Sequence, residues 1–521
     1  MVKGKEAEGA KYRDYFQFSE PLRRCTSHRL LAMRRGEAEG ILRVSILPAD
    51  EADSLARIAR RYVRPGAPCA AQVEMAVGDA YKRLLRPSIE NEFAALSKER
   101  ADREAIRVFA QNLRQLLLAP PLGRKRIMGI DPGFRTGCKV VCLDEQGNLL
   151  HHDTIYPHAP IHHAAEASVK LMDMMERYRI EAVAIGTGTA GRETEELVRS
   201  LPTAAGVRVF PVSEDGASVY SASKLGREEF PDQDVTVRGA VSIGRRLADP
   251  LAELVKIDPK AIGVGQYQHD VDQGELKRSL DRTVELCVNT VGVNLNTASK
   301  HLLTYVSGLG PVLAQNIVDY RTEHGPFRSR RSLMDVPRLG AKAFEQCAGF
   351  LRIDDGDNPL DNTAVHPERY ALVEQMAHDA GCDVPQLIAS KETRRGIDLG
   401  RYCRDGVGLP TLTDIMEELD KPGRDMRGEI KAFSFDSRLH TIDDLEPGMV
   451  VPGVVSNITN FGCFVDLGIK TKGLIHVSQM ADRFVRDPAE VVSIRQQVRV
   501  KVLSVDTERG RVALTLKGVE Q

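Results

Sequence analysis

The sequence has no tryptophan and few aromatic residues (5%), and its nine cysteines are scattered without a single C-x-x-C pair. Without paired cysteines we expect neither a zinc site nor a disulfide framework, which fits a reducing cytoplasm. No apolar signal core opens the chain, and no run of about 18 apolar residues occurs, so no membrane span is predicted. No Walker-type loop, H-E-x-x-H or G-x-S-x-G pattern is present either.

The chain also lacks an excess of either charge. Lysine and arginine (72) balance aspartate and glutamate (73), for a formal net charge of −1. No global field therefore indicates a nucleic-acid partner, and any such signal has to be local. At 521 residues the chain is too long for one core. We predict a multidomain, mainly α-helical protein with one α/β domain and a C-terminal β-barrel.

In the C-terminal segment, apolar and polar residues alternate as they do in the strands of a small antiparallel barrel. "GMVVPGVVSNITNFGCFVDLGIKTKGLIHVSQM" supplies strands and glycine turns, and "RQQVRVKVLSVDTERGRVALTLK" supplies two more strands. It resembles the S-one (S1) domain, an RNA-binding OB fold. Alternation places Phe461, Phe464 and His476 on one exposed face, where bases stack at about 1–3 kcal/mol each. The alternative is that these aromatic residues belong to the barrel core.

Basic residues strengthen the binding interpretation of the barrel. Between Glu446 and Lys517 there are ten Lys/Arg and seven Asp/Glu. The cations that we expect to bind nucleic acid are Arg495, Lys501 and Arg511.

Two glycine-containing hairpins lie between helices in the segment 301–353. "VSGLGPVLAQ" and, about thirty residues later, "VPRLGAKAF" resemble paired helix-hairpin-helix motifs. Glycine lets the backbone approach a phosphate, and the following helix presents its N–H groups. Such contacts fix position without reading sequence. Arg338 stands where a small or apolar residue is usual, so the second hairpin is either a binding site or a packing copy. The residues expected at the phosphates are Gly308, Leu309, Gly310, Leu339 and Gly340.

The stretch "RIMGIDPGFRTGCKVVCLD" begins an order of strands and helices that is typical of ribonuclease-H-like folds. It resembles the YqgF/RuvC branch, whose nucleases hold two divalent cations with three or four carboxylates. Asp131 occupies the first carboxylate position. The partner strand ends in "GTGT", where the second carboxylate is missing, although Glu214 or Asp215 could approach Asp131. The catalytic candidates are thus Asp131, Glu214 and Asp215, an incomplete set.

Three interpretations of this domain remain. In the favoured one it is a non-catalytic scaffold and no cofactor is expected. In the second, the protein is a metal-dependent nuclease that acts on structured or branched nucleic acid with Mg²⁺ or Mn²⁺ near Asp131. The third is a nucleotide site of the sugar-kinase and actin type, which would require a second copy of the fold that the sequence does not contain.

The combination of these segments resembles the bacterial Tex family of transcription accessory proteins. The agreement extends over strings such as "SHRLLAMRRGE", "GIDPGFRTGCK", "GTGTAGRETE" and "SEDGASVYSAS". The resemblance implies a cytoplasmic factor that binds RNA, and also DNA, with little sequence specificity. It leaves RNA polymerase and the ribosome open as partners. The family's usual helical N-terminal region is predicted to be missing.

The predicted domains are a helical region (1–120), a YqgF/RuvC-like ribonuclease-H-fold domain (121–225), a helical connector (226–300), a tandem helix-hairpin-helix (301–365), a helical and loop region (366–439) and an S1-type OB-fold RNA-binding domain (440–521).

Overall fold

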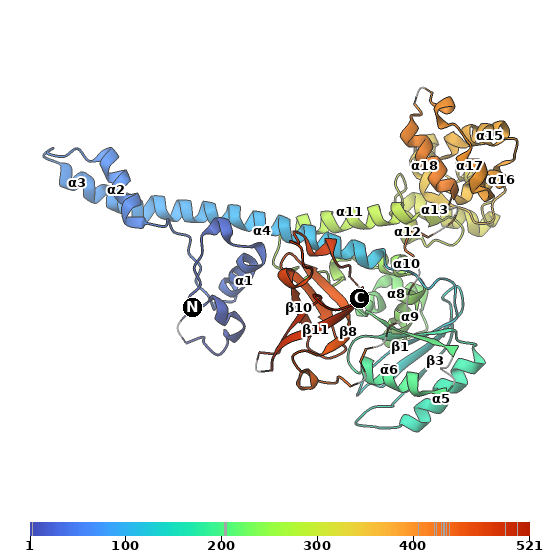
Figure 1. The fold of residues 1–521 in the computed structure, drawn as a ribbon, viewed down its shortest axis with the longest axis horizontal. Helices are drawn as coiled ribbons and strands as arrows, with labels where there is room; N and C mark the ends of the chain where they lie inside the picture. The colour runs from blue at the N-terminus through green and yellow to red at the C-terminus, as the bar shows by residue number, and fades with distance from the viewer. Residues whose placement is uncertain are drawn as a thin grey trace. The chain divides into compact units, whose positions relative to one another are not determined.

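The computed structural model describes residues 1–521 except 3, 203–205, 405, 421, 422, 424, 429, 431, 432, 434, 437, 495, 508 and 521. The chain divides into two compact units, residues 1–111 with 264–279 and residues 112–263 with 280–521. Figure 1 labels the helices and strands and colours them along the chain from blue to red. Among the described residues, no helix combines the length and apolar content that crossing a bilayer requires.

The first unit is helical. It contains α1 (Ser27–Ala38), α2 (Glu51–Tyr62), α3 (Ala70–Ala80) and the first part of α4 (Arg86–Leu117). A small cluster of buried residues around Tyr12, Ile41 and Leu42 lies beside α1. The Arg35 guanidinium of α1 pairs with Asp270 and donates to the carbonyl oxygen of Gln266 (2.8 Å), which ties residues 264–279 to this unit.

A five-stranded sheet begins the second unit, in the order β3-β2-β1-β4-β5. Strand β1 pairs antiparallel with β2 and parallel with β4, and β4 pairs parallel with β5. The strands are β1 (Ile127–Asp131), β2 (Cys138–Leu143), β3 (Leu149–Ile155), β4 (Ala182–Gly186) and β5 (Arg208–Val212).

Helices cover both faces of this sheet, which is why its central strands are continuous apolar runs. Helices α5 (Ala164–Arg177) and α6 (Gly191–Ser200) pack on one face, and α9 (Val235–Ala248) packs on the other. Gly129 lets α9 approach β1 directly, because a Cβ there would lie 2.5 Å from the carbonyl oxygen of Ala240. The short helices that surround α9 are α7 (Ala217–Ala222), α8 (Lys224–Glu229) and α10 (Pro250–Leu254).

Helices form the middle of the chain. Helix α11 (Gln273–Val291) leads to α12 (Lys300–Thr304), α13 (Pro311–His324) and α14 (Ala341–Cys347), and the short parallel strands β6 (Val293–Asn294) and β7 (Leu351–Arg352) pair around them. A second helical group has a core of its own. Its helices are α15 (Tyr370–Asp379), α16 (Val384–Ala389), α17 (Lys391–Arg395) and α18 (Leu409–Asp420).

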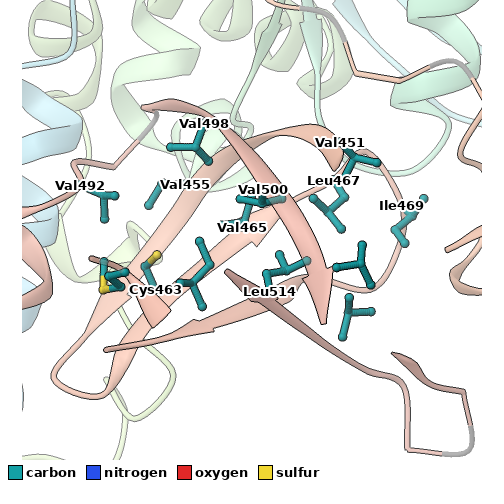
Figure 2. Close-up of a cluster of buried hydrophobic side chains, with 14 of the residues drawn as sticks. Val451, Val455, Cys463, Val465, Leu467, Ile469, Val492, Val498, Val500 and Leu514 are labelled. Carbon is teal, nitrogen blue, oxygen red and sulfur yellow. The ribbon is translucent and has the colours of Figure 1, made fainter. Parts of the chain in front are cut away.

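The C-terminal strands close into a barrel in the order β10-β12-β11-β8-β9, which confirms the predicted OB-like fold. Figure 2 shows its core of inward valine, leucine and isoleucine side chains with Cys463 among them. Alternate residues point into this core, as the period of two in the sequence predicts. The strands are β8 (Val450–Thr459), β9 (Gly462–Asp466), β10 (Gly473–His476), β11 (Gln497–Asp506) and β12 (Arg511–Thr515).

Two arginines of α6 hold the chain that leads into the barrel. Arg192 donates to the carbonyl oxygens of Asp436 (2.8 Å) and Gly468 (2.7 Å). Arg199 donates to the carbonyl oxygen of Phe433 (2.9 Å). The α/β domain is therefore fastened to the barrel and its leading segment through main-chain acceptors.

Candidate nucleic-acid interface

The three aromatic residues predicted on the barrel lie together at one end of it. Phe464 pairs with Leu474 and Gly462 pairs with His476 across β9 and β10, so Phe464 and His476 are diagonal neighbours on the outer surface. The ring of Phe461 contacts that of Phe464 edge-to-face, with centroids 6.2 Å apart and planes at 89°. His476 is exposed, whereas the two phenylalanines are half-buried because each shields part of the other.

Gly462 makes this arrangement possible. Its φ is +151°, and a Cβ at this position would lie 2.0 Å from the carbonyl oxygen of Ile475. The strands therefore approach more closely beside the aromatic rings than any other residue would allow.

Hydrogen bonding fixes the orientation of the His476 ring. Its Nδ1 accepts the backbone N–H of Ser478 (3.3 Å) and lies 2.8 Å from the hydroxyl of the same residue. A neutral ring with Nδ1 as acceptor carries its proton on Nε2. The exposed edge of the imidazole is thus a hydrogen-bond donor.

The predicted cations do not all gather around these rings. Lys501 lies opposite Thr515 at the aromatic end, two strands away from His476, and is exposed. Arg511 pairs with Asp506 at the opposite end of the same two strands. Arg495 lies outside the described residues. The structure therefore groups Lys501 with the aromatic residues and separates Arg511 from them.

The first helical hairpin has the backbone that its glycines predict. Gly308 adopts φ +78°, and its Cβ would lie 2.5 Å from the Cβ of Gln346 on α14. Leu309 is buried, and Gly310 is the N-cap of α13, with open space around it and no side-chain cap. The first N–H groups of α13 are therefore open to a phosphate at this hairpin.

The second hairpin repeats this backbone. Arg338 adopts φ +67°, which matches Gly308, while Leu339 is buried and Gly340 is the N-cap of α14 in open space. Asn316 of α13 donates to the carbonyl oxygen of Pro337 (2.7 Å) and so joins the two hairpins. The unusual arginine changes the side chain and leaves the hairpin geometry intact.

A fully buried arginine joins these hairpins to the next helical group. The Arg330 guanidinium donates to the carbonyl oxygen of Val365 (2.7 Å) and to that of Thr363, and to the Tyr370 hydroxyl (3.0 Å). The Tyr370 hydroxyl in turn donates to Asp361 (2.6 Å). Burial lowers the pKa of Arg330.

In the α/β domain the structure brings two of the three candidate acids together. Asp131 ends β1 and Glu214 follows β5, with β4 between these strands. Burial, and then the charge of Glu214, raises the pKa of Asp131 to about 6, while Lys139 opposes the shift. Asp215 differs, because its carboxylate accepts a hydrogen bond from the Ser213 hydroxyl (3.0 Å).

The glycines of "GTGT" make room for Glu214. A Cβ on Gly188 would lie 1.7 Å from a Glu214 carboxylate oxygen, and the Gly188 N–H donates to that carboxylate. Across the described part of the chain, no group of three or more His, Cys, Asp or Glu side chains is placed to hold a metal ion. Asp131 and Glu214 therefore fall short of a two-metal carboxylate set.

Family models match most of the chain. They are "Tex central region-like" (residues 1–109), "Tex protein YqgF-like domain" (125–248), "Helix-hairpin-helix motif" (288–352), "HHH domain" (358–427) and "S1 RNA binding domain" (444–517).

Two of these matches change the sequence-based interpretation. The match at residues 1–109 contradicts the prediction that the family's N-terminal helical region is missing. The match at 358–427 identifies a further helix-hairpin-helix domain where the sequence suggested only helices and loops. The sequence does carry a signal in this region, because Gly406 (φ +79°) and Gly408 form a G-x-G directly before α18.

Whole-chain relatives agree with the family models. The chain is 51% identical to "Protein tex" of Bordetella pertussis, over 99% of this chain and 67% of that protein. It is 48% identical to "Protein YhgF" of Escherichia coli, over 100% of this chain and 69% of that protein. It is also 48% identical to "Transcriptional accessory protein Tex" of Neisseria gonorrhoeae, over 99% of this chain and 69% of that protein.

Proposed function

Because the chain belongs to the Tex family, we propose that it is a transcription accessory factor that binds RNA, and also DNA, with little sequence preference. The observation that carries this proposal is the group formed by Phe461, Phe464 and His476 at one end of the S1 barrel. The name of the N. gonorrhoeae relative supports a role in transcription, so RNA polymerase is favoured over the ribosome as partner. We place the protein in the cytoplasm.

Single-stranded RNA binds at the barrel by stacking and charge. Bases stack on the phenylalanine rings, the Nε2–H of His476 donates a hydrogen bond, and Lys501 attracts the phosphates. None of these contacts reads a base edge in a fixed pattern, so sequence preference is weak. Affinity should fall as salt rises, with a slope of about 0.7 for each phosphate contact.

The helical hairpins supply contacts to duplex DNA. Gly310 and Gly340 are the N-caps of α13 and α14, and neither helix has a side-chain cap; because Pro311 has no N–H, the first donor of α13 is Val312. Such N–H groups bind backbone phosphate irrespective of sequence. In this proposal the ribonuclease-H-like domain is a scaffold that fastens the barrel.

The test is a binding titration with single-stranded RNA at fixed salt. Phe461→Ala combined with Phe464→Ala should weaken binding about tenfold or more, because two stacking contacts of about 1–3 kcal/mol are lost. Leu503→Ala is the matched control, since Leu503 is an apolar barrel residue that is 43% exposed and lies outside the aromatic group. Wild-type affinity in a folded double variant would contradict the proposal.

A nuclease is the second candidate, favoured only by the convergence of Asp131 and Glu214. The test is incubation with branched DNA or structured RNA in the presence of Mg²⁺ or Mn²⁺, with Asp131→Asn as the control. Cleavage by the wild type and not by the variant would replace the scaffold interpretation. Absence of cleavage by both leaves the domain a scaffold.

A further inference from the structure

The connection between β10 and β11 displays a phenylalanine to solvent. Phe484 is 89% exposed, more than any other large apolar side chain recorded in the described part of the chain. Arg483 and Arg486, close to it on either side, are exposed as well. Across the described residues neither guanidinium forms a hydrogen bond or an ion pair. An exposed aromatic face between two available cations has the composition of a stacking site for single-stranded nucleic acid.

Buried neighbours hold this segment in place. Met480, Val485 and Pro488 are buried, and Val485 lies directly between Phe484 and Arg486. Asp482 forms an ion pair with Lys517 after β12 (3.9 Å), and Asp487 caps the helical turn Pro488–Glu490. The exposure of Phe484 is thus imposed by an anchored backbone, with the apolar neighbour buried and the aromatic ring outside.

The segment leaves the barrel at its aromatic end. The backbone N–H of Val477 donates to the carbonyl oxygen of Phe461 (2.8 Å), and the carbonyl oxygen of Gln479 accepts from Leu516 (3.0 Å). Phe484 follows His476 by eight residues, a span of at most about 29 Å. A single strand bound at His476 therefore has at most about 29 Å to span to reach Phe484.

We propose that Arg483, Phe484 and Arg486 form a second base-stacking site, which extends the path of single-stranded nucleic acid beyond the barrel face. The inference rests on the proposed function for the direction of that path. Phe484 stacks one base, and the two guanidinium groups contact the flanking phosphates. The site is sequence-tolerant because every base has a π-face.

The test compares a short and a long labelled oligouridylate, of about 4 and about 16 nucleotides, which bracket the site sizes of OB folds. Phe484→Ala should weaken binding of the long probe about fivefold or more and change binding of the short probe less than twofold. Phe484→Tyr should bind both probes normally because it keeps the aromatic face, and Leu503→Ala is the matched control. Arg483→Gln with Arg486→Gln should lower the salt slope for the long probe by about 1.4.

The outcomes separate this inference from the proposed function. In one outcome, Phe461→Ala with Phe464→Ala weakens the binding of both probes, while Phe484→Ala binds the long probe like the wild type. The proposal of a second site is then wrong, and the barrel interface stands. If Phe484→Ala weakens the binding of the long probe while the double variant binds both probes normally, the connection between β10 and β11 binds RNA and the proposed barrel interface is wrong. If Phe484→Ala binds RNA normally but no longer co-purifies with RNA polymerase, the loop is a protein contact and the inference is overturned.

Discussion

Replacing Asp131 by asparagine should stabilise the folded protein at neutral pH, and the gain should fade in acid. Asp131 is largely buried beside Glu214, so its pKa rises from the ordinary value of 3.8 to about 6. Well below pH 3.8 the carboxyl group is protonated in both the folded and the unfolded chain, and no penalty arises. Well above pH 6 it is ionised in both, and the folded state carries the full cost of the buried charge.

The pKa difference sets the magnitude. At about 1.4 kcal/mol for each pKa unit, a shift from 3.8 to about 6 corresponds to about 3 kcal/mol of lost stability at pH 8. At pH 5 the same linkage gives about half of that penalty. The stability gain of Asp131→Asn over the wild type should therefore about double between pH 5 and pH 8.

The assay is denaturant unfolding of the full chain. Hydrogen exchange at the amides of β1 is the readout, so that unfolding of the α/β domain is observed by itself. The difference between variant and wild type cancels the groups that titrate over the same range without interacting with Asp131. Glu214→Gln removes the smaller cause of the Asp131 shift together with the buried Glu214 carboxyl, whose pKa is also raised by burial, so it too should stabilise the folded state at neutral pH. A gain that stays constant between pH 5 and pH 8 would refute the assignment of a raised pKa to Asp131.

Two further substitutions test the packing of the interface. Gly462→Ala should lower the melting temperature of the barrel and weaken RNA binding, because its Cβ would lie 2.0 Å from the Ile475 carbonyl oxygen; circular dichroism that matches the wild type would contradict this. Arg330→Met should cost about 3 kcal/mol, since two buried backbone carbonyls lose their donor. Arg331→Met, at the exposed neighbouring position, should leave unfolding unchanged, and an equal loss in both variants would show that the buried contacts are unimportant.

Local periodicity was sufficient to predict the barrel face. Phe464 and His476 lie on adjacent antiparallel strands, where a period of two decides which side chains point outward. The edge-to-face contact between Phe461 and Phe464 could not be predicted in this way, because Phe461 lies in the turn before β9, where a period of two does not apply. Arg338 is a similar case, because its left-handed backbone conformation cannot be predicted from the residue type.

Long-range neighbours could not be predicted from spacing. Both Glu214 and Asp215 follow β5, and only the fold decides that Glu214 lies over Gly188 while Asp215 turns to Ser213. The helix-hairpin-helix domain at 358–427 was missed although Gly406 and Gly408 form a G-x-G directly before α18, because one such turn by itself is a weak signal.

The arginines of α6 have an evolutionary consequence. Arg192 and Arg199 bind carbonyl oxygens of Phe433, Asp436 and Gly468, groups that every amino acid supplies. The segment before the barrel can therefore accumulate substitutions without losing these attachments. Compensating pairs of substitutions should be rare there, and methods that find contacts from covarying positions should overlook this junction.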